Sequence, residues 1–323
     1  MKKDVVVTVV IITYNHEKFI EQAIDSVLMQ KVNFNYEVLI GNDCSPDNTK
    51  NILLKYEKYD FFKIFNRPKN MGANKNSCDL LKRAKGKYVA FLEGDDYWTD
   101  ENKLQKQVDF LENHQEYIGV AHRQNVVDIN GKYIKTYEEW SKRHSKKYTK
   151  KDVEKGNMFF QGNALMVKNF YKDNDFSFIY KIDPLVGDRS NLAFFTSFGD
   201  IYILNDNMSV YRWFEKPERK RELLEDSIHS LEYYTKLEKI VFPNNQTFNF
   251  QSYKNRLIAN YYFFSILRIK KIDWKKSKNL KKYTNLPIMF IIIIVFFKYL
   301  FVYIGNFFWK IYKKIGELLC KKN

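Results

Sequence analysis

Carboxylate side chains follow two apolar segments in the N-terminal half of the sequence. Asp43 comes after the run 36–40, and the neighbours Asp95 and Asp96 come after the run 88–92. Carboxylate oxygens are hard ligands that bind Mg²⁺ or Mn²⁺, and such a cation can carry a diphosphate. The neighbouring pair therefore indicates a site for a cation and a diphosphate. The alternative is a solvated turn in which one of the two acids caps the following helix.

Glycine-rich phosphate loops are missing from the sequence. No Gly-x-Gly-x-x-Gly follows the first apolar run, residues 5–12, and no Gly-x-x-x-x-Gly-Lys-[Ser/Thr] occurs. These two loops bind the phosphates of dinucleotides and of nucleoside triphosphates, so neither ligand class is indicated. The five histidines lack the spacing of a metal site. We expect them to be structural or exposed, with His16, close to the end of the first run, as the one candidate for a role in a site.

Alternating strands and helices must position these acids. Four apolar runs predict β-strands, over 5–12, 36–40, 61–65 and 88–92. Apolar residues at helical spacing follow each run, and Asn15 is a candidate N-cap for the first helix. The alternation predicts an α/β fold with a mostly parallel sheet flanked by helices. Because ligands bind beyond the carboxyl ends of such strands, we expect Thr13, Tyr14 and Asn15 to lie near the acids.

The sequence ends in a basic and apolar segment. Residues 268–323 contain 14 Lys and Arg against two acids, while the whole chain has a net charge of +16. The stretch 286–309 is almost entirely apolar and would be about 36 Å long as a helix, enough to cross a bilayer. Its lysines share one half of a helical wheel, which fits a helix lying in the membrane interface. A buried helix of the soluble core is the remaining alternative. We expect a membrane-associating tail over 284–323, either on the surface or crossing.

Composition limits the class of protein and its location. The 323 residues are 45% hydrophobic and 28% charged, a globular balance rather than a disordered one. Three cysteines lie far apart without a Cys-x-x-Cys motif, which excludes a disulfide framework and a zinc module and favours a reducing compartment. The first apolar run is too short for a membrane span and lacks a cleavage site, so we expect no secretion signal. The expected location is the cytoplasmic face of the cell membrane.

Five short motifs occur in order over residues 5–215. They are Thr13-Tyr14-Asn15, Asn42-Asp43-Cys44-Ser45-Pro46-Asp47-Asn48-Thr49, Asn70-Met71-Gly72, Glu93-Gly94-Asp95-Asp96-Tyr97-Trp98, and Val186-Gly187-Asp188 followed by Ser209-Val210-Tyr211-Arg212. Together they resemble glycosyltransferase family 2, whose members are inverting enzymes with the GT-A fold, and in particular the type that acts on bacterial cell-surface polysaccharide.

The resemblance implies donor-binding roles for six residues, of which Asp95 is the last. Tyr14, between Thr13 and Asn15 in the first motif, would pack near the nucleotide base. Asp43 would accept a hydrogen bond from a ring nitrogen of that base, as expected for uridine. Lys75 stands where the family often has an arginine near the donor.

The resemblance also implies the catalytic groups. Asp96 would hold Mg²⁺ or Mn²⁺ against the diphosphate, with Asp95 beside the donor's ribose or sugar. Glu93 stands where the family has the first aspartate of an Asp-x-Asp motif and is a further candidate for the cation. Asp188 resembles the catalytic base that takes the proton of the acceptor hydroxyl. The alternative is that it only caps the following helix; the less favoured bases are Asp183 and Glu215.

Two further segments are open to two interpretations each. Arg212 either contacts a donor phosphate or pairs with an acid. The segment Gln161-Gly162-Asn163 either places polar groups at the acceptor site or forms a turn.

These expectations combine into one function with two rivals. The chain would transfer a sugar from a nucleotide donor, a UDP-sugar by preference, to a lipid-linked or cell-surface glycan, with a membrane surface as partner and no nucleic acid. Its expected parts are a nucleotide-sugar half (1–115), an acceptor half (116–215), a helical extension (216–283) and the tail (284–323). The rivals are a glycoside hydrolase with two carboxylates and a non-enzymatic binder of membrane or nucleic acid.

Overall fold

The computed structural model describes residues 4–141, 145–183, 187–214, 223–242, 245–267 and 278–284, with positions 287 and 293. The chain divides into two compact units, one of residues 1–218 with 239–248 and one of residues 219–238 with 249–323. All but three positions of the expected tail lie outside the described residues. Within the described ranges, no helix has both the length and the apolar character that crossing a membrane requires.

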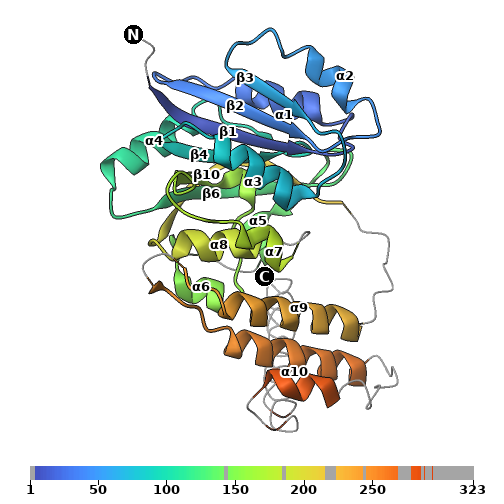
Figure 1. The fold of residues 1–323 in the computed structure, drawn as a ribbon. Coiled ribbons are helices and arrows are strands. Elements are labelled where there is room, and N and C mark those ends of the chain that lie inside the picture. Colours follow the sequence, from blue (N-terminus) through green and yellow to red (C-terminus); the bar gives the residue numbers. More distant parts are fainter. Residues whose placement is uncertain are drawn as a thin grey trace, which may run out of the picture. The chain divides into compact units, whose positions relative to one another are not determined.

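The N-terminal half of the first unit forms four parallel strands (Figure 1). They are β1 (Val5–Thr13), β2 (Asn35–Asn42), β3 (Phe62–Asn66) and β4 (Tyr88–Glu93). Their order in the sheet is β3-β2-β1-β4, so the chain moves outward from β1 and then returns to its other side. This confirms the predicted parallel arrangement and places the switch point, where ligands bind in such sheets, between β1 and β4.

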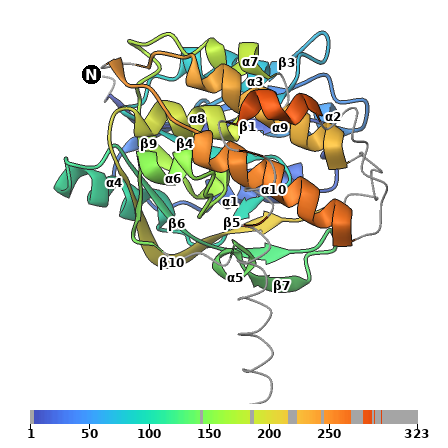
Figure 2. The same ribbon diagram turned by 90° about the horizontal axis from the view of Figure 1, so that it is seen from below.

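The second half of the sheet is mixed, so the prediction of a mostly parallel sheet is wrong here. The strands are β5 (Tyr97–Trp98), β6 (Gly119–Val127), β7 (Tyr133–Thr136), β8 (Lys147–Tyr148), β9 (Met166–Lys168) and β10 (Ile201–Arg212). The short β9 inserts between β4 and β6 and is antiparallel to both. β10 is parallel to β6, and Figure 2 shows the helix α5 (Tyr137–Ser141) next to β7. Strands that are added antiparallel need no crossover helix.

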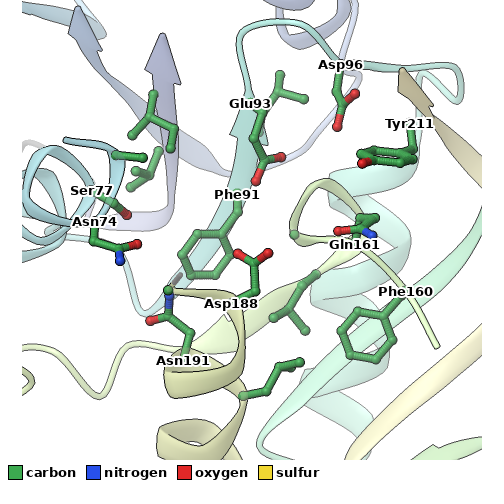
Figure 3. Close-up of a pocket in the computed structure, with 18 of the residues that line it drawn as sticks. Asn74, Ser77, Phe91, Glu93, Asp96, Phe160, Gln161, Asp188, Asn191 and Tyr211 are labelled. Atoms are coloured by element: carbon green, nitrogen blue, oxygen red, sulfur yellow. The ribbon is translucent and has the colours of Figure 1, made fainter. Parts of the chain in front are cut away.

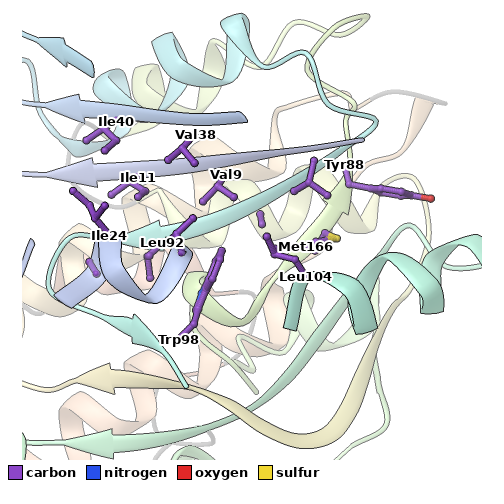
Figure 4. Packing of buried hydrophobic residues seen from close by; sticks show 14 of the residues in the cluster. Val9, Ile11, Ile24, Val38, Ile40, Tyr88, Leu92, Trp98, Leu104 and Met166 are labelled. Carbon is purple, nitrogen blue, oxygen red and sulfur yellow. The ribbon is translucent and has the colours of Figure 1, made fainter. Parts of the chain in front are cut away.

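Helices pack on both faces of the sheet, and each face presents alternate side chains of the same strands. On one face pack α1 (Ile20–Leu28), α2 (Thr49–Leu54) and α4 (Lys103–Asn113). Val9 and Ile11 point to this side, where they join a fully buried core (Figure 4). Val10 and Ile12 point to the other side, since side chains alternate along a strand. There they face a cavity lined also by α3 (Ala73–Arg83) and α8 (Asp188–Thr196).

Two predicted helix caps are wrong. Helix α1 begins after Phe19, not after Asn15; instead Asn15 has a φ of 61° and its N–H donates to Ser45 Oγ at 3.0 Å. Helix α4 has Asn102 at its N-cap position, so neither acid of the pair before it caps that helix. The residues 94–95 do form a turn, but the capping role that was the alternative interpretation of the pair is excluded.

The remaining short elements of the first unit are α6 (Lys150–Glu154), α7 (Phe178–Ile182) and a 3₁₀ turn, η1 (Gly162–Ala164). The second unit contains α9 (Leu223–Glu238), α10 (Gln251–Leu267) and the 3₁₀ turn η3 (Lys278–Tyr283). A salt bridge of 2.6 Å joins Lys254 Nζ to Glu238 Oε2, and the rings of Tyr234 and Phe250 pack with centroids 4.8 Å apart. These helices fall within the segment 216–283, for which the apolar periodicity predicts helices.

Candidate active site

A cavity of about 310 Å³ lies at the carboxyl end of β4, between α3 and α8 (Figure 3). Its volume is in the range of small-molecule sites. Its lining includes Ile12 of β1 and Glu93 of β4, so it is located at the predicted switch point of the parallel strands. The predicted acids Asp95, Asp96 and Asp188 all contribute to its lining, although 92 residues separate the last two in sequence.

Uncompensated negative charge gathers in this cavity. Burial, with the nearby charges of Asp188 and Asp95, raises the pKa of Glu93 to about 8. The Glu93 Oε2 atom is buried and has no hydrogen-bond partner within the described ranges. Asp188 is exposed as a residue, but loss of water around its carboxylate raises its pKa, against the opposing effect of Arg189. Several carboxylates that lack protein partners destabilise one another unless a cation neutralises them. Over the described ranges, no three His, Cys, Asp or Glu side chains are grouped as a metal site, so a cation at the predicted acids stays a prediction and would need phosphate oxygens as further ligands.

Asp96 has a different environment, because both of its carboxylate oxygens are turned into the protein. Only 2% of the residue is exposed. Its Oδ1 accepts the backbone N–H of Arg212 at 2.7 Å, and its Oδ2 accepts Asn163 Nδ2 at 2.6 Å. Burial, with Asp95 and Glu93 nearby, raises its pKa well above the usual value. Asp96 lines the cavity with both oxygens already accepting protein N–H groups, and its predicted role as the cation ligand stays a prediction.

The turn η1 supports two of the carboxylates at once. Asn163, fully buried, holds Asp96 as described, and Gly162 lies so close to Glu93 that a Cβ there would be 2.8 Å from Glu93 Oε1. Asn163 is itself fixed by hydrogen bonds to Val210 O, Ser209 Oγ, Gln124 Nε2 and Trp98 Nε1. The predicted segment 161–163 is thus a turn that positions the acids, and Gln161 also lines the cavity.

Arg212 holds the backbone of the acidic motif. Its Nε donates to the carbonyl oxygen of Asp95 at 2.9 Å, and its Nη2 donates to Gln22 Oε1 at 2.9 Å. The guanidinium lies 4.6 Å from the ring centroid of Phe19, and only 4% of the residue is exposed. In the described part of the chain Arg212 thus binds the backbone carbonyl of Asp95 rather than a carboxylate, and because Arg212 also lines the cavity, a contact with a donor phosphate stays a prediction.

Of the six residues predicted to bind the donor, Asp95 lines this cavity and the other five do not. The loops after β1 and β2, which carry four of them, are joined by two hydrogen bonds: Asp43 N–H donates to Thr13 O at 3.0 Å, and Asn15 N–H donates to Ser45 Oγ. Tyr14 is 45% exposed, and Lys75 on α3 is exposed as well. The structure thus brings the β1 and β2 loops together next to the cavity, while the roles of these residues stay predictions.

Asp43 fixes the turn that begins α3. The residue is 3% exposed, and its two carboxylate oxygens accept the backbone N–H groups of Met71 and Gly72 at 2.8 and 2.9 Å. Each oxygen has a second lone pair, so the carboxylate can still accept a bond from a ligand.

His16 connects the β1 loop to the acids. Its Nδ1 is 3.3 Å from Thr13 Oγ1, and its Nε2 is 3.8 Å from Asp95 Oδ2. Burial lowers the pKa of this imidazole, with Asp95 and Asp47 opposing the shift. The histidine is thus near the site without being part of the cavity lining.

Asp188 is the first residue of α8, and Gly187 occupies the N-cap position. The cap interpretation of Asp188 is therefore not what the structure shows. The backbone before Asp188 is held by α3: Asn74 Nδ2 donates to Asp183 O at 2.8 Å, and Asn74 packs so closely on Gly187 that a Cβ there would be 1.9 Å from Asn74 Oδ1.

The sequence reasoning missed several residues of the cavity, chiefly Asn74, Ser77, Phe91 and Asn191. A signal was available for one of them. Asn191 lies three positions after Asp188, and residues at this spacing share a face of a helix. Any helix beginning at Asp188 therefore presents both side chains to the same ligand.

The sheet order and the acidic cavity at the end of β4 define an α/β fold shared with glycosyltransferases. The structure is similar to that of S. aureus TarS, residues 1–349, solved in complex with UDP-GlcNAc. The TM-score is 0.54 at 17% sequence identity, and the match covers 85% of this chain and 79% of that one. At this identity the likeness concerns the fold.

The family follows from the sequence comparison. The family model for glycosyl transferase family 2 matches residues 8–174, and the chain belongs to this family. It is 32% identical to Rv1520 of Mycobacterium tuberculosis, an uncharacterized protein, over 216 residues that make up 64% of this chain and 58% of that protein. It is 36% identical over 106 residues, 33% of this chain and 41% of the relative, to WfaP of Escherichia coli. WfaP is named a UDP-Glc:alpha-D-GlcNAc-diphosphoundecaprenol beta-1,3-glucosyltransferase.

Proposed function

We propose that this protein transfers a sugar from a UDP-sugar to a hydroxyl group of a lipid-linked or cell-surface glycan, by a single inverting displacement. The observation that carries the proposal is the grouping of Glu93, Asp95 and Asp188 in one cavity at the switch point of the parallel strands. Membership of family 2, the UDP-GlcNAc bound to TarS and the UDP-Glc in the name of WfaP support it.

Glu93 and Asp95 would hold Mg²⁺ or Mn²⁺. The unpartnered Glu93 Oε2 and the raised pKa of that side chain are what a carboxylate designed for a cation shows in its absence. When bound, the cation would neutralise the charge of the leaving diphosphate. Asp96 would keep the loop of Asp95 in place through its bonds to Arg212 and Asn163.

Asp188 would act as the general base that takes the proton of the acceptor hydroxyl. Its carboxylate faces the cavity close enough to Glu93 to raise the pKa of that group (Figure 3). The raised pKa of Asp188 itself makes it a stronger proton acceptor than a free aspartate. Asn74 and Gly187 would set the position of this base by fixing the backbone around it.

The base of the nucleotide would bind at the joined β1 and β2 loops. Asp43 keeps acceptor capacity for the ring N–H of uracil, and the exposed ring of Tyr14 offers a surface for stacking. His16 lies between these loops and Asp95, so a nucleotide here would direct its phosphates toward Glu93 and Asp95.

We also propose that the chain works at the cytoplasmic face of the membrane, held by the segment 284–323. The support is the charge and apolar pattern of that segment in the sequence. The diphosphoundecaprenol in the name of WfaP supports a lipid-linked acceptor, which such a segment would bring within reach.

The proposal is tested by titrating the detergent-solubilised chain with UDP, with and without Mn²⁺, in a calorimeter. We expect metal-dependent binding of UDP that Asp95→Asn abolishes. Asp206→Asn is the matched control, because Asp206 lies outside the cavity with its side chain 52% exposed. Titrations with GDP and dTDP complete the series. Preference for one of these would change the donor, whereas failure of the folded protein to bind any of the three would refute the proposal.

A further inference from the structure

The inner wall of the cavity is apolar, in contrast to the acids at its mouth. Phe91 of β4 packs against Phe195 of α8 with ring centroids 6.0 Å apart, and both rings line the cavity. Cys78, Ile179 and Leu192 extend the same wall. Apart from the weakly polar thiol of Cys78, these side chains offer no hydrogen-bonding group along that surface. A sugar hydroxyl pressed against it would lose its bonds to water without replacement, at a cost of about 1–3 kcal/mol.

Two amide side chains border this apolar wall, and one offers a hydrogen-bond acceptor while the other offers a donor. Asn74 uses its Nδ2 on Asp183 O, and its Oδ1 accepts no hydrogen bond from the described part of the chain. Asn191 accepts the hydroxyl of Tyr171 at 3.4 Å through Oδ1, and over the same described ranges its Nδ2 donates to no group. Figure 3 shows Asn74 and Asn191 close to the ring of Phe91. One free acceptor and one free donor thus lie beside an apolar surface.

This combination matches one sugar substituent. An acetamido group has a methyl for an apolar wall, an N–H for an acceptor and a carbonyl oxygen for a donor. We propose that the inner part of the cavity is a subsite for the acetamido group of a donor N-acetylhexosamine, with Asn74 Oδ1 accepting its N–H and Asn191 Nδ2 donating to its carbonyl. This inference rests on the proposed function and names the class of sugar.

The position of the base agrees with an acetamido group at C2. Asp188 and Asn191 share one face of α8, because they are three residues apart in the same helix. A base at Asp188 serves the acceptor hydroxyl that attacks C1. The substituent on the adjacent carbon, C2, is then the one within reach of Asn191 and of the wall formed by Phe91 and Phe195.

The test compares matched donors on the full chain in detergent with Mn²⁺. UDP-GlcNAc and UDP-Glc differ mainly at C2, and so do UDP-GalNAc and UDP-Gal. We expect each acetamido donor to bind about tenfold more tightly than its plain partner, the scale of discrimination that one apolar group with polar contacts provides. Asn191→Leu keeps the volume and removes the donor, and it should reduce this ratio severalfold. Asn113→Leu, an exposed position on α4, is the matched control and should leave the ratio unchanged.

The outcomes separate this inference from the function on which it rests. If UDP binds with metal and neither pair shows a preference for the acetamido sugar, the subsite is refuted and the transferase proposal stands. If UDP does not bind, the function itself fails and the subsite with it. If Asn191→Leu does not fold, the two donor pairs on the unaltered chain still decide the question.

Discussion

Replacing Asp96 by asparagine tests whether this carboxylate binds a cation or stabilises the fold. The substitution preserves shape and removes the charge. In the structure both oxygens of Asp96 accept N–H groups, one from the backbone of Arg212 and one from the side chain of Asn163. An asparagine has one oxygen and one NH₂ group, so it can accept from only one of these donors. The other donor then faces an NH₂ group in a fully buried place.

The expected loss of stability follows from those two contacts. A hydrogen bond to a charged group contributes about 1.5–3 kcal/mol, and a buried donor left unpaired costs about 1–3 kcal/mol. The burial that raises the pKa of Asp96 reduces the net benefit of its charge, so we expect a total near the lower end, about 2–4 kcal/mol. At about 2–4 °C per kcal/mol, the melting temperature should fall by roughly 4–16 °C. UDP binding at a temperature where the variant is folded should weaken by less than tenfold.

The assay pairs a melting curve with a UDP titration in Mn²⁺ for Asp96→Asn, Asp95→Asn and the control Asp206→Asn. We expect Asp95→Asn to keep the melting temperature and lose metal-dependent binding, the reverse of Asp96→Asn. If Asp96→Asn melts like the unaltered protein and loses the metal dependence, then Asp96 holds the cation and the assignment made from its hydrogen bonds is wrong.

Three further variants test other parts of the structure. Asp188→Asn should keep UDP affinity within about twofold and lower turnover at least a hundredfold, the scale of general-base catalysis; equal turnover in an assay with the UDP-sugar that binds would exclude Asp188 as the base. Gly187→Ala puts a Cβ 1.9 Å from Asn74 Oδ1 and should cost about 1–3 kcal/mol, seen as a lower melting temperature; no change would show that Asn74 moves freely. Burial, with a smaller effect of Lys103, holds the pKa of His122 well below 6.5 in the folded protein. As the pH is lowered below 6.5, the histidine is therefore protonated in the unfolded chain before it is protonated in the folded one, and the free energy of unfolding decreases. This loss of stability is up to about 1.4 kcal/mol per pH unit. Between pH 5 and 7, the melting temperature of His122→Gln should therefore depend less on pH than that of the unaltered protein.

The strands and acids of the N-terminal half could be predicted because their signals are local. Each strand is an apolar run of five to eight residues, and Asp95 and Asp96 directly follow one of them. The antiparallel β9 has three residues, too few for a recognisable pattern, and its position between β4 and β6 depends on pairing with distant segments. The parallel order was therefore predictable for β1 to β4 and not for the rest.

The roles of the acids required contacts that no local pattern contains. Asp96 stands 67 positions before Asn163 and 116 before Arg212, and only these partners distinguish it from its neighbour Asp95. Asn15 shows that a local pattern can also predict a role that distant contacts overrule. As a residue type it suits a helix cap, but the bond of its N–H to Ser45 on the next loop holds it at a positive φ instead.

The bond between Asp96 and the backbone of Arg212 also bears on how the protein reaches its folded state. All four parallel strands and Asp96 itself are contained in the first 96 residues, whereas Arg212 is the last residue of β10. A ribosome must therefore add more than a hundred residues before that carboxylate finds its partner, and closing such a loop is a slow, late step. Until then the half-site at the ends of β1 and β4 does not yet have both groups that donate to Asp96. Nucleotide binding would thus begin only when the final strand of the sheet has docked.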